Sequence, residues 1–176
     1  FQEGEGSLRL AAAYTGLKVA LSSAADGTRI TLEEDYTDEN ADETQIINGT
    51  EEAPVVLDLD GHTMSMESVI GVGTGAQDGK GAFAICDSSE EKTGIFQADL
   101  SAGSGQEFVF HNQGSLKLSD AVFTSVTGQL VNNDAGGSLE INRAKLKYEG
   151  QAAGAPDKIP LIRTYGAAAI TDTQIE

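Results

Sequence analysis

The fold of this chain is decided by a short stretch, Gly114 to Phe123, which reads GSLKLSDAVF. A second stretch, Gly137 to Leu146, reads GSLEINRAKL and matches the first position by position. Counted from the first leucine, apolar side chains fall at offsets 0, 2, 5 and 7 in both stretches. Self-similarity of this kind is the sequence signature of a repeat architecture.

Two further copies extend the series. Residues 55–64 read VVLDLDGHTM, with Leu57 at offset 0, and residues 166–175 read GAAAITDTQI, with Ala168 at offset 0. In the four copies, only His62 and Thr173 break the apolar pattern. Partial copies have offset 0 at Ile30 and Phe83, and Gly6–Leu10 is a weaker match.

The pattern predicts two short strands joined by a bend. Offsets 0 and 2 lie on one face of a strand, because strand side chains alternate between faces. Offsets 5 and 7 resume that period on a second strand. The residues between them tolerate a bend; they are Asp60-Gly61, Ser119-Asp120, Asn142-Arg143 and Thr171-Asp172. A third strand is predicted from the apolar segments before most copies: Ile46-Ile47, Val69-Ile70, Phe108-Val109-Phe110, Leu130-Val131 and Leu161-Ile162.

We therefore predict an all-β fold, a right-handed parallel β-helix in which each coil has three strands and coils stack around a shared core. An antiparallel β-sandwich is the main rival, but it predicts hairpin alternation rather than one asymmetric pattern repeated along the chain. The predicted inward-facing residues are Leu57, Leu59, Met64, Phe83, Ile85, Leu116, Leu118, Phe123, Leu139, Ile141, Leu146 and Ile170.

A helix is predicted at the N-terminal end of this single domain, residues 1–176. It covers about residues 14–27, with the coils in 28–176. Thr15 fits an N-cap and Gly27 fits the residue just after the helix. Leu17, Ala20, Leu21, Ala24 and Ala25 share one face at helical spacing. The last coil, which includes Ala168–Ile175, shows no such cap, so we expect an open edge that stacks on a partner.

Residues 55–64 also resemble the V-L-D-L-N-G-H-T-I coil of pectate-lyase-like β-helix repeats in large bacterial surface proteins. The stretch from Leu17 to Tyr36 resembles their opening segment, in which a short helix closed by Asp-Gly caps the first coil. The resemblance implies an extracellular or cell-surface protein and says little about activity. Asp60 stands where the family usually has asparagine, so we expect no asparagine ladder through that position, because an ionised carboxylate cannot donate.

The composition narrows the possible partners. With 11 basic and 28 acidic residues the formal net charge is −17, which disfavours nucleic acid and anionic membranes. No apolar run is long enough for a transmembrane helix. Cys86 is the single cysteine, which excludes an intrachain disulfide.

The acidic residues weakly suggest two functions, calcium binding and catalysis by carboxylates. The stretch Glu33–Glu52 is rich in carboxylates but lacks a calcium-loop spacing, so a solvated loop is the plainer interpretation. A polysaccharide lyase or hydrolase would need acids grouped across coils. The outward column at offset 1 contains no adjacent acid pair; it comprises Thr31, Asp58, Ala84, Lys117, Glu140 and Ala169. The weak calcium candidates are Asp58, Asp60, Asp38 and Asp42.

The remaining reactive side chains are interpreted as structural. His62 and His111 are the histidines of the chain, and His62 occupies a core slot, where we expect it to be partly buried. Cys86 falls in a bend slot, where we expect a passive, exposed thiol. Asn48-Gly49-Thr50 fits a turn.

These observations predict a non-enzymatic extracellular module: a stalk, spacer or adhesin segment. No catalytic residue or cofactor is assigned. The expected partners are a surface ligand or carbohydrate and, through end-to-end stacking, another coil. The alternative is a polysaccharide lyase or glycoside hydrolase using carboxylates on the β-helix surface.

Overall fold

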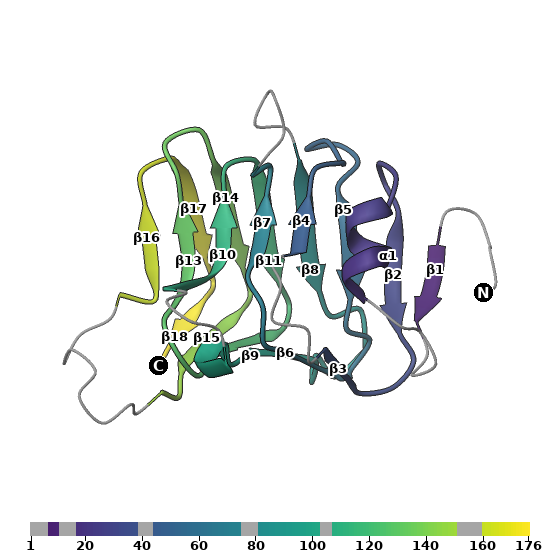
Figure 1. Ribbon diagram of the computed structural model, residues 1–176. Helices are drawn as coiled ribbons and strands as arrows, with labels where there is room; N and C mark the ends of the chain where they lie inside the picture. The colour runs from purple at the N-terminus through teal and green to yellow at the C-terminus, as the bar shows by residue number, and fades with distance from the viewer. Residues whose placement is uncertain (1–6, 11–16, 39–43, 75–80, 103–106, 151–159) are drawn as a thin grey trace.

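The computed structural model describes residues 7–10, 17–38, 44–74, 81–102, 107–150 and 160–176. Within these residues the chain is mostly β, with three parallel sheets and one short α-helix (Figure 1). The prediction of a β-rich fold with parallel strands is therefore confirmed. The colours of Figure 1 run from one end of the sheets to the other, so position along the sheets follows position in the sequence.

Each sheet is built from strands that are far apart in the sequence. Sheet A contains, in order, β1 (Ser7–Leu10), β2 (Arg29–Leu32), β5 (Val55–Asp58), β8 (Ala82–Cys86), β11 (Ser115–Ser119), β14 (Ser138–Asn142) and β17 (Ala167–Thr171). Sheet B contains β3 (Tyr36–Asp38), β6 (Thr63–Met66), β9 (Ile95–Ala98), β12 (Val122–Ser125), β15 (Lys145–Tyr148) and β18 (Gln174–Ile175). Sheet C contains β4 (Thr44–Ile46), β7 (Ile70–Val72), β10 (Phe108–Asn112), β13 (Gln129–Asn133) and β16 (Ile162–Thr164). A 3₁₀ turn, η1 (Leu100–Ala102), follows β9.

From β2 onward the chain visits sheet A, then sheet B, then sheet C, and repeats this order up to β18. We call one such pass a circuit. The strands of successive circuits pair in parallel. The third strand predicted for each repeat is confirmed, because the apolar segments before the copies form the strands of sheet C.

The predicted bend between the first two strands is confirmed by the backbone. Asp120, Arg143 and Asp172 have φ angles of 57°, 49° and 48°, in the left-handed region. Asp60 has φ 44° and Gly61 has φ 84°. A single left-handed residue turns the chain sharply, which is why polar or glycine residues occupy the second position of these pairs.

The register of sheet A differs from the sequence alignment by two residues between β5 and β8. Leu57 pairs with Ile85, and Phe83 pairs with Val55, whereas the alignment placed Leu57 opposite Phe83. A slip of two residues keeps every side chain on its face, so the apolar pattern cannot detect it. The correction moves Asp58 into the column of Cys86, out of the column of Ala84.

The predicted core is confirmed with one exception. The four largest fully buried side chains are Phe83, Phe96, Phe110 and Phe123, and Phe96 lies with its ring centroid 5.2 Å from that of Phe110. Ile170 was predicted to be buried, but it is 44% exposed. It lies on β17, the last strand of sheet A, so its Ile141 neighbour covers it from one side only.

The N-terminal end of the sheets has two separate covers. Helix α1 (Leu17–Ser23) packs against β4 of sheet C, with Ala20, Leu21 and Ala24 buried. Strand β1, the weak sequence match at Gly6–Leu10, adds an edge strand to sheet A. Helix α1 ends at Ser23, before the predicted end near Gly27, and Ala25 is exposed, so the prediction was wrong at the C-terminal end of the helix. The predicted N-cap, Thr15, lies outside the described residues.

Candidate functional site

A cluster of polar side chains lies on the outer face of sheet C and at the turn that leads into sheet A. It comprises His111, Gln113, Asn132, Asp134 and Tyr165, and we call it the sheet C cluster. His111 on β10 is in register with Asn132 on β13, and Asn132 is in register with Arg163 on β16. The parallel register therefore brings residues from three circuits together on one face.

Asp134 is the centre of this cluster. Its Oδ2 lies 2.9 Å from His111 Nε2 and accepts a hydrogen bond of 2.9 Å from Gln113 Nε2. Its Oδ1 accepts a hydrogen bond of 3.0 Å from Asn132 Nδ2. The ring of Phe108 lies with its centroid 5.0 Å from that of His111. Three side chains therefore hold the carboxylate in one orientation.

These contacts keep Asp134 ionised. Burial acts to raise its pKa, but the hydrogen bonds from Gln113 and His111 outweigh it, and the pKa of Asp134 falls below its usual value. A cavity of about 580 Å³ beside it is lined by Gln113, Asp134, Ala135, Gly136 and Tyr165. Tyr165 is 67% exposed. A fixed carboxylate, amide groups and an exposed ring can hydrogen-bond and stack a polar ligand.

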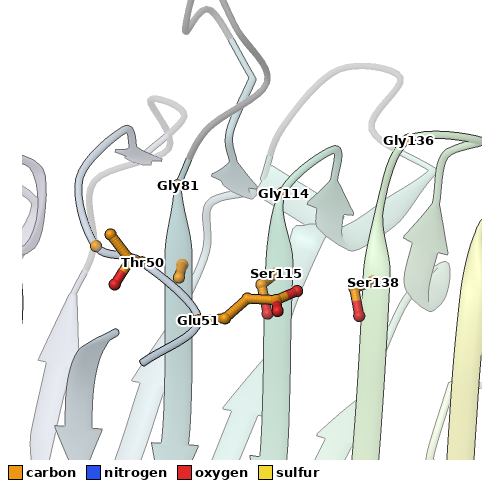
Figure 2. Close-up of a pocket in the computed structure, with 9 residues that line it drawn as sticks. Thr50, Glu51, Gly81, Gly114, Ser115, Gly136 and Ser138 are labelled. Atoms are coloured by element: carbon orange, nitrogen blue, oxygen red, sulfur yellow. The ribbon is translucent and has the colours of Figure 1, made fainter. Parts of the chain in front are cut away.

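A second hollow runs along the ends of the sheet A strands. It has a volume of about 350 Å³ and borders the first at Gly136. Figure 2 shows Ser115 and Ser138 on neighbouring strands, with Thr50 and Glu51 in the segment that crosses beside them. Small residues form its floor, because Ser115 is in register with both Ala82 and Ser138. Its acidic group is Glu51, the single charged residue among those that line it.

Asp58, the main candidate for a catalytic or calcium-binding carboxylate, is already paired. Its side chain is only 3% exposed, and its Oδ2 accepts a hydrogen bond of 2.5 Å from Arg29 Nη1. Its Oδ1 accepts hydrogen bonds from the backbone N–H groups of Ser88 and Asp60, at 2.9 and 3.2 Å. The charge and lone pairs of Asp58 are therefore used within the fold.

Cys86 is partly buried, whereas the sequence predicted an exposed, passive thiol. It lies beside Asp58 in sheet A and is partly buried, with Arg29 Nη1 at 3.6 Å from its Sγ. Burial raises the pKa of the Cys86 thiol, the carboxylate of Asp58 raises it further, and Arg29 opposes both. The thiol therefore stays protonated at neutral pH.

The calcium candidates do not converge. Asp38 is buried on β3 in sheet B, and Asp60 is exposed at a bend beside Asp58. Asp42 lies outside the described residues. Among the residues that the structure describes, no three His, Cys, Asp or Glu side chains gather as a metal site would require. We therefore do not build a site on these residues.

Of the two histidines, one joins a cluster and one does not. His62 is partly buried, as expected, with its side chain 34% exposed and its Nδ1 at 3.7 Å from Asp35 Oδ1. The sequence pattern assigned no site to His111, and it did not single out Asp134 or Tyr165. A signal was present: His111-Asn112-Gln113 and Asn132-Asn133-Asp134 share a central asparagine, and these asparagines pair in register.

No helix in the described ranges is both long enough and apolar enough to cross a membrane. The comparisons with known proteins add no relative: no family model, curated protein or solved structure matches the chain. The resemblance of residues 55–64 to β-helix repeats of surface proteins therefore stays a prediction.

Proposed function

We propose that the three sheets form a right-handed parallel β-helix that serves as a non-enzymatic module of a surface protein. The regular order of sheets A, B and C in successive circuits supports the solenoid. The strong preference of parallel crossover connections for the right hand supports its handedness. The function that such a scaffold fits best is that of a stalk, spacer or adhesin segment.

The observation that carries this proposal is a continuous column of positions in register across sheet A, buried from Ile30 to Ile141. In sheet A, Leu8, Ile30, Leu57, Ile85, Leu118, Ile141 and Ile170 follow one another strand by strand. Each circuit is packed on its neighbours, so the protein grows in one direction by about 4.8 Å per circuit. Length and rigidity are the properties that a spacer requires.

An adhesive role is favoured by the sheet C cluster. Asp134 is held by Gln113 and Asn132 beside a cavity of about 580 Å³. The exposed ring of Tyr165 completes a surface that suits a polar ligand such as a carbohydrate. Because the net charge of −17 repels polyanions, we propose a neutral rather than an acidic ligand.

The enzymatic alternative depends on surface carboxylates, whereas the environment of Asp58 indicates that this residue has a structural role. A catalytic acid must reach its substrate, whereas Asp58 is buried and bonded to Arg29. The pair resembles a scaffold contact more than a catalytic one. Extracellular localisation, like the bacterial surface context, is part of this proposal and rests on the sequence resemblance.

Two measurements test the proposal. Small-angle X-ray scattering should fit the profile of the stacked circuits, and a profile that does not fit them would contradict the solenoid. Incubation with pectin, alginate and hyaluronan, with and without calcium, should release no new sugar ends. Calcium-dependent cleavage that disappears in Asp58→Ala would instead establish the lyase alternative. The matched control is Asp134→Ala, which removes a carboxylate of the sheet C cluster.

A further inference from the structure

The hollow on sheet A lies over the starts of three neighbouring strands, β8, β11 and β14. Ala82, Ser115 and Ser138 occupy equivalent positions in these strands, because they are in register with one another. Neighbouring strands lie about 4.8 Å apart, so the three small side chains form one row across the sheet. Their size leaves open the volume of about 350 Å³ above them.

Ser115 carries a buried hydroxyl that the fold does not use. The residue is 7% exposed and lines the hollow, and its Oγ forms no hydrogen bond with any residue that the structure describes. The buried Ser125, by contrast, donates a hydrogen bond of 3.0 Å to the backbone oxygen of Thr127. Buried hydroxyls are normally hydrogen-bonded. The partner of the Ser115 hydroxyl must therefore come from whatever fills the hollow.

Glu51 adds a carboxylate to the same hollow. Figure 2 shows its side chain extending in the direction of Ser115, and both residues line the hollow. The turn that carries Glu51 is held by two backbone hydrogen bonds of 3.1 Å between Thr50 and Ala53. In the described ranges no side chain pairs with the Glu51 carboxylate. Because an ionised carboxylate only accepts hydrogen bonds, a ligand must present donors to it, whereas the Ser115 hydroxyl can donate and accept.

The hollow on sheet A continues into the cavity of the sheet C cluster, because Gly136 lines both. We call the two hollows together the combined groove. Glu51 and Ser115 lie in one half of it, and Asp134 and Tyr165 lie in the other. From β8 to the turn before β17 the combined groove crosses three strand spacings, or about 14 Å. A ligand that fills it must therefore be a chain rather than a single small ring.

We propose that a linear, uncharged saccharide lies in the combined groove, across the strands of sheet A. Hydroxyl groups of the chain donate to Glu51 and form the hydrogen bond that Ser115 lacks. A ring at the other end of the chain stacks on the exposed ring of Tyr165. Carboxylates in both halves of the groove repel an acidic chain. The inference rests on the proposed adhesive role and extends its site from the sheet C cluster onto sheet A.

Affinity electrophoresis through gels that contain a soluble neutral polysaccharide tests the binding. The four probes are a β-glucan, a mannan, an arabinoxylan and a galactan, and at least one should retard the protein. Titration calorimetry with oligosaccharides of that polymer should show an affinity that rises with chain length and levels off once both hollows are filled. No retardation by any of the four probes, or an affinity that is independent of chain length, overturns the proposal.

The salt dependence of binding tests the absence of charge on the ligand. Affinity should stay the same from about 0.01 M to about 1 M salt, because an uncharged chain has no attraction to the protein that salt can screen. An affinity that disappears at high salt would indicate a cationic ligand and overturn the proposal of a neutral one.

Two variants, which we call the sheet A variants, test the new half of the site. Ser115→Ala removes one hydrogen bond and should weaken binding of the longest oligosaccharide by about threefold to tenfold. Glu51→Ala should weaken it in the same way, and its thermal stability should match that of the parent, because the residue is exposed. The matched control is Ser65→Ala, on β6 of sheet B, which should bind as the parent does. Unchanged binding in both sheet A variants overturns the proposal.

Gly136→Leu tests whether the two hollows form one groove. A Cβ on Gly136 would meet its nearest atom at 3.8 Å, so a side chain fits there and blocks the junction. This variant should bind short oligosaccharides as the parent does and lose the gain in affinity with chain length. Full binding by Tyr165→Ala would instead place the ligand on sheet A alone and overturn the single groove.

The same variants distinguish failure of this inference from failure of the proposed function. If Tyr165→Ala abolishes binding while Gly136→Leu and the sheet A variants do not change it, the adhesive site at the sheet C cluster stands and its extension onto sheet A is wrong. If the parent protein binds none of the four polysaccharides, the adhesive role fails as well, whereas scattering still reports on the scaffold.

Discussion

Asn112 donates a hydrogen bond of 2.7 Å from its Nδ2 to the Oδ1 of Asn133, and both side chains are fully buried. Asn133 in turn donates from its Nδ2 to Thr164 Oγ1 at 2.9 Å and to the backbone oxygen of Ala167 at 3.0 Å. Three circuits are thus linked at the turn from sheet C to sheet A. In the sequence, the resemblance to β-helix repeats pointed to such a ladder position only at Asp60, on the turn from sheet A to sheet B.

Removing the centre of this ladder should destabilise the protein. Asn133→Ala removes the Oδ1 that accepts a hydrogen bond from the buried Asn112, and an unsatisfied buried polar group costs about 1–3 kcal/mol. We expect the free energy of unfolding in urea to fall by about that amount. Asn142→Ala, at an asparagine that Thr171 Oγ1 contacts near the surface, is the control and should change much less.

One column of sheet A gives a graded test of burial. Leu118, Ile141 and Ile170 pair in succession, and Leu118 is 0% exposed whereas Ile170 is 44% exposed. Leu118→Asp should unfold the protein, because it buries an unpaired carboxylate. Ile170→Asp should leave the circular dichroism spectrum intact. Equal thermal stability of Leu118→Asp and the parent would show that the assigned register is wrong.

Alanine substitutions at two glycines in the turns from sheet C to sheet A should change the stability of the protein by very different amounts. A Cβ on Gly81 would lie 2.5 Å from the backbone oxygen of Ile46 and 2.8 Å from the backbone nitrogen of Gly73. Gly81→Ala should therefore cost about 1–3 kcal/mol of unfolding free energy through overpacking. A Cβ on Gly136 would meet its nearest atom at 3.8 Å. Gly136→Ala should change stability by less than about 0.5 kcal/mol.

The reactivity of Cys86 should report the charges beside it. Because Asp58 raises the pKa of the thiol, Asp58→Asn should lower that pKa and accelerate alkylation by iodoacetamide at about pH 8. Arg29→Gln should slow it, because the guanidinium opposes the rise. The rates are measured on folded protein, with denatured protein as reference. Equal rates in the two variants would contradict the assigned contacts.

Acid should destabilise the protein, because it protonates carboxylates whose pKa is lowered by contacts in the folded state. Burial acts to raise the pKa of Asp87, but hydrogen bonds from Ser89, Gly94 and Gly61 outweigh it and hold it below the ordinary 3.8. A carboxylate whose pKa is lowered by folding stabilises the protein at pH values above its pKa in the unfolded state. That stabilisation is lost as the pH falls through its pKa in the folded state. Stability should therefore decline below about pH 4. Asp87→Asn should be less stable at neutral pH and lose less in acid.

The sequence by itself determined the local elements of this protein. Apolar residues at offsets 0, 2, 5 and 7 specified strand, bend and strand, because side-chain alternation in a strand is a local property. The bends at Asp120, Arg143 and Asp172 were predictable, because a polar pair interrupts the alternation there. Their left-handed backbone suits aspartate by residue type, whereas residue type does not predict it for Arg143. Most of the core followed from these two rules.

Only the tertiary structure decided how circuits align and which residues meet. The two-residue slip that pairs Leu57 with Ile85 leaves every side chain on the same face of the sheet, so the periodicity of apolar residues cannot reveal it. The Asp134 cluster and the Arg29–Asp58 pair depend on that alignment, because their members are neighbours across strands and distant along the chain. The exposure of Ile170 depends on what lies beyond β17, and a pattern of residues cannot specify whether a neighbour is present.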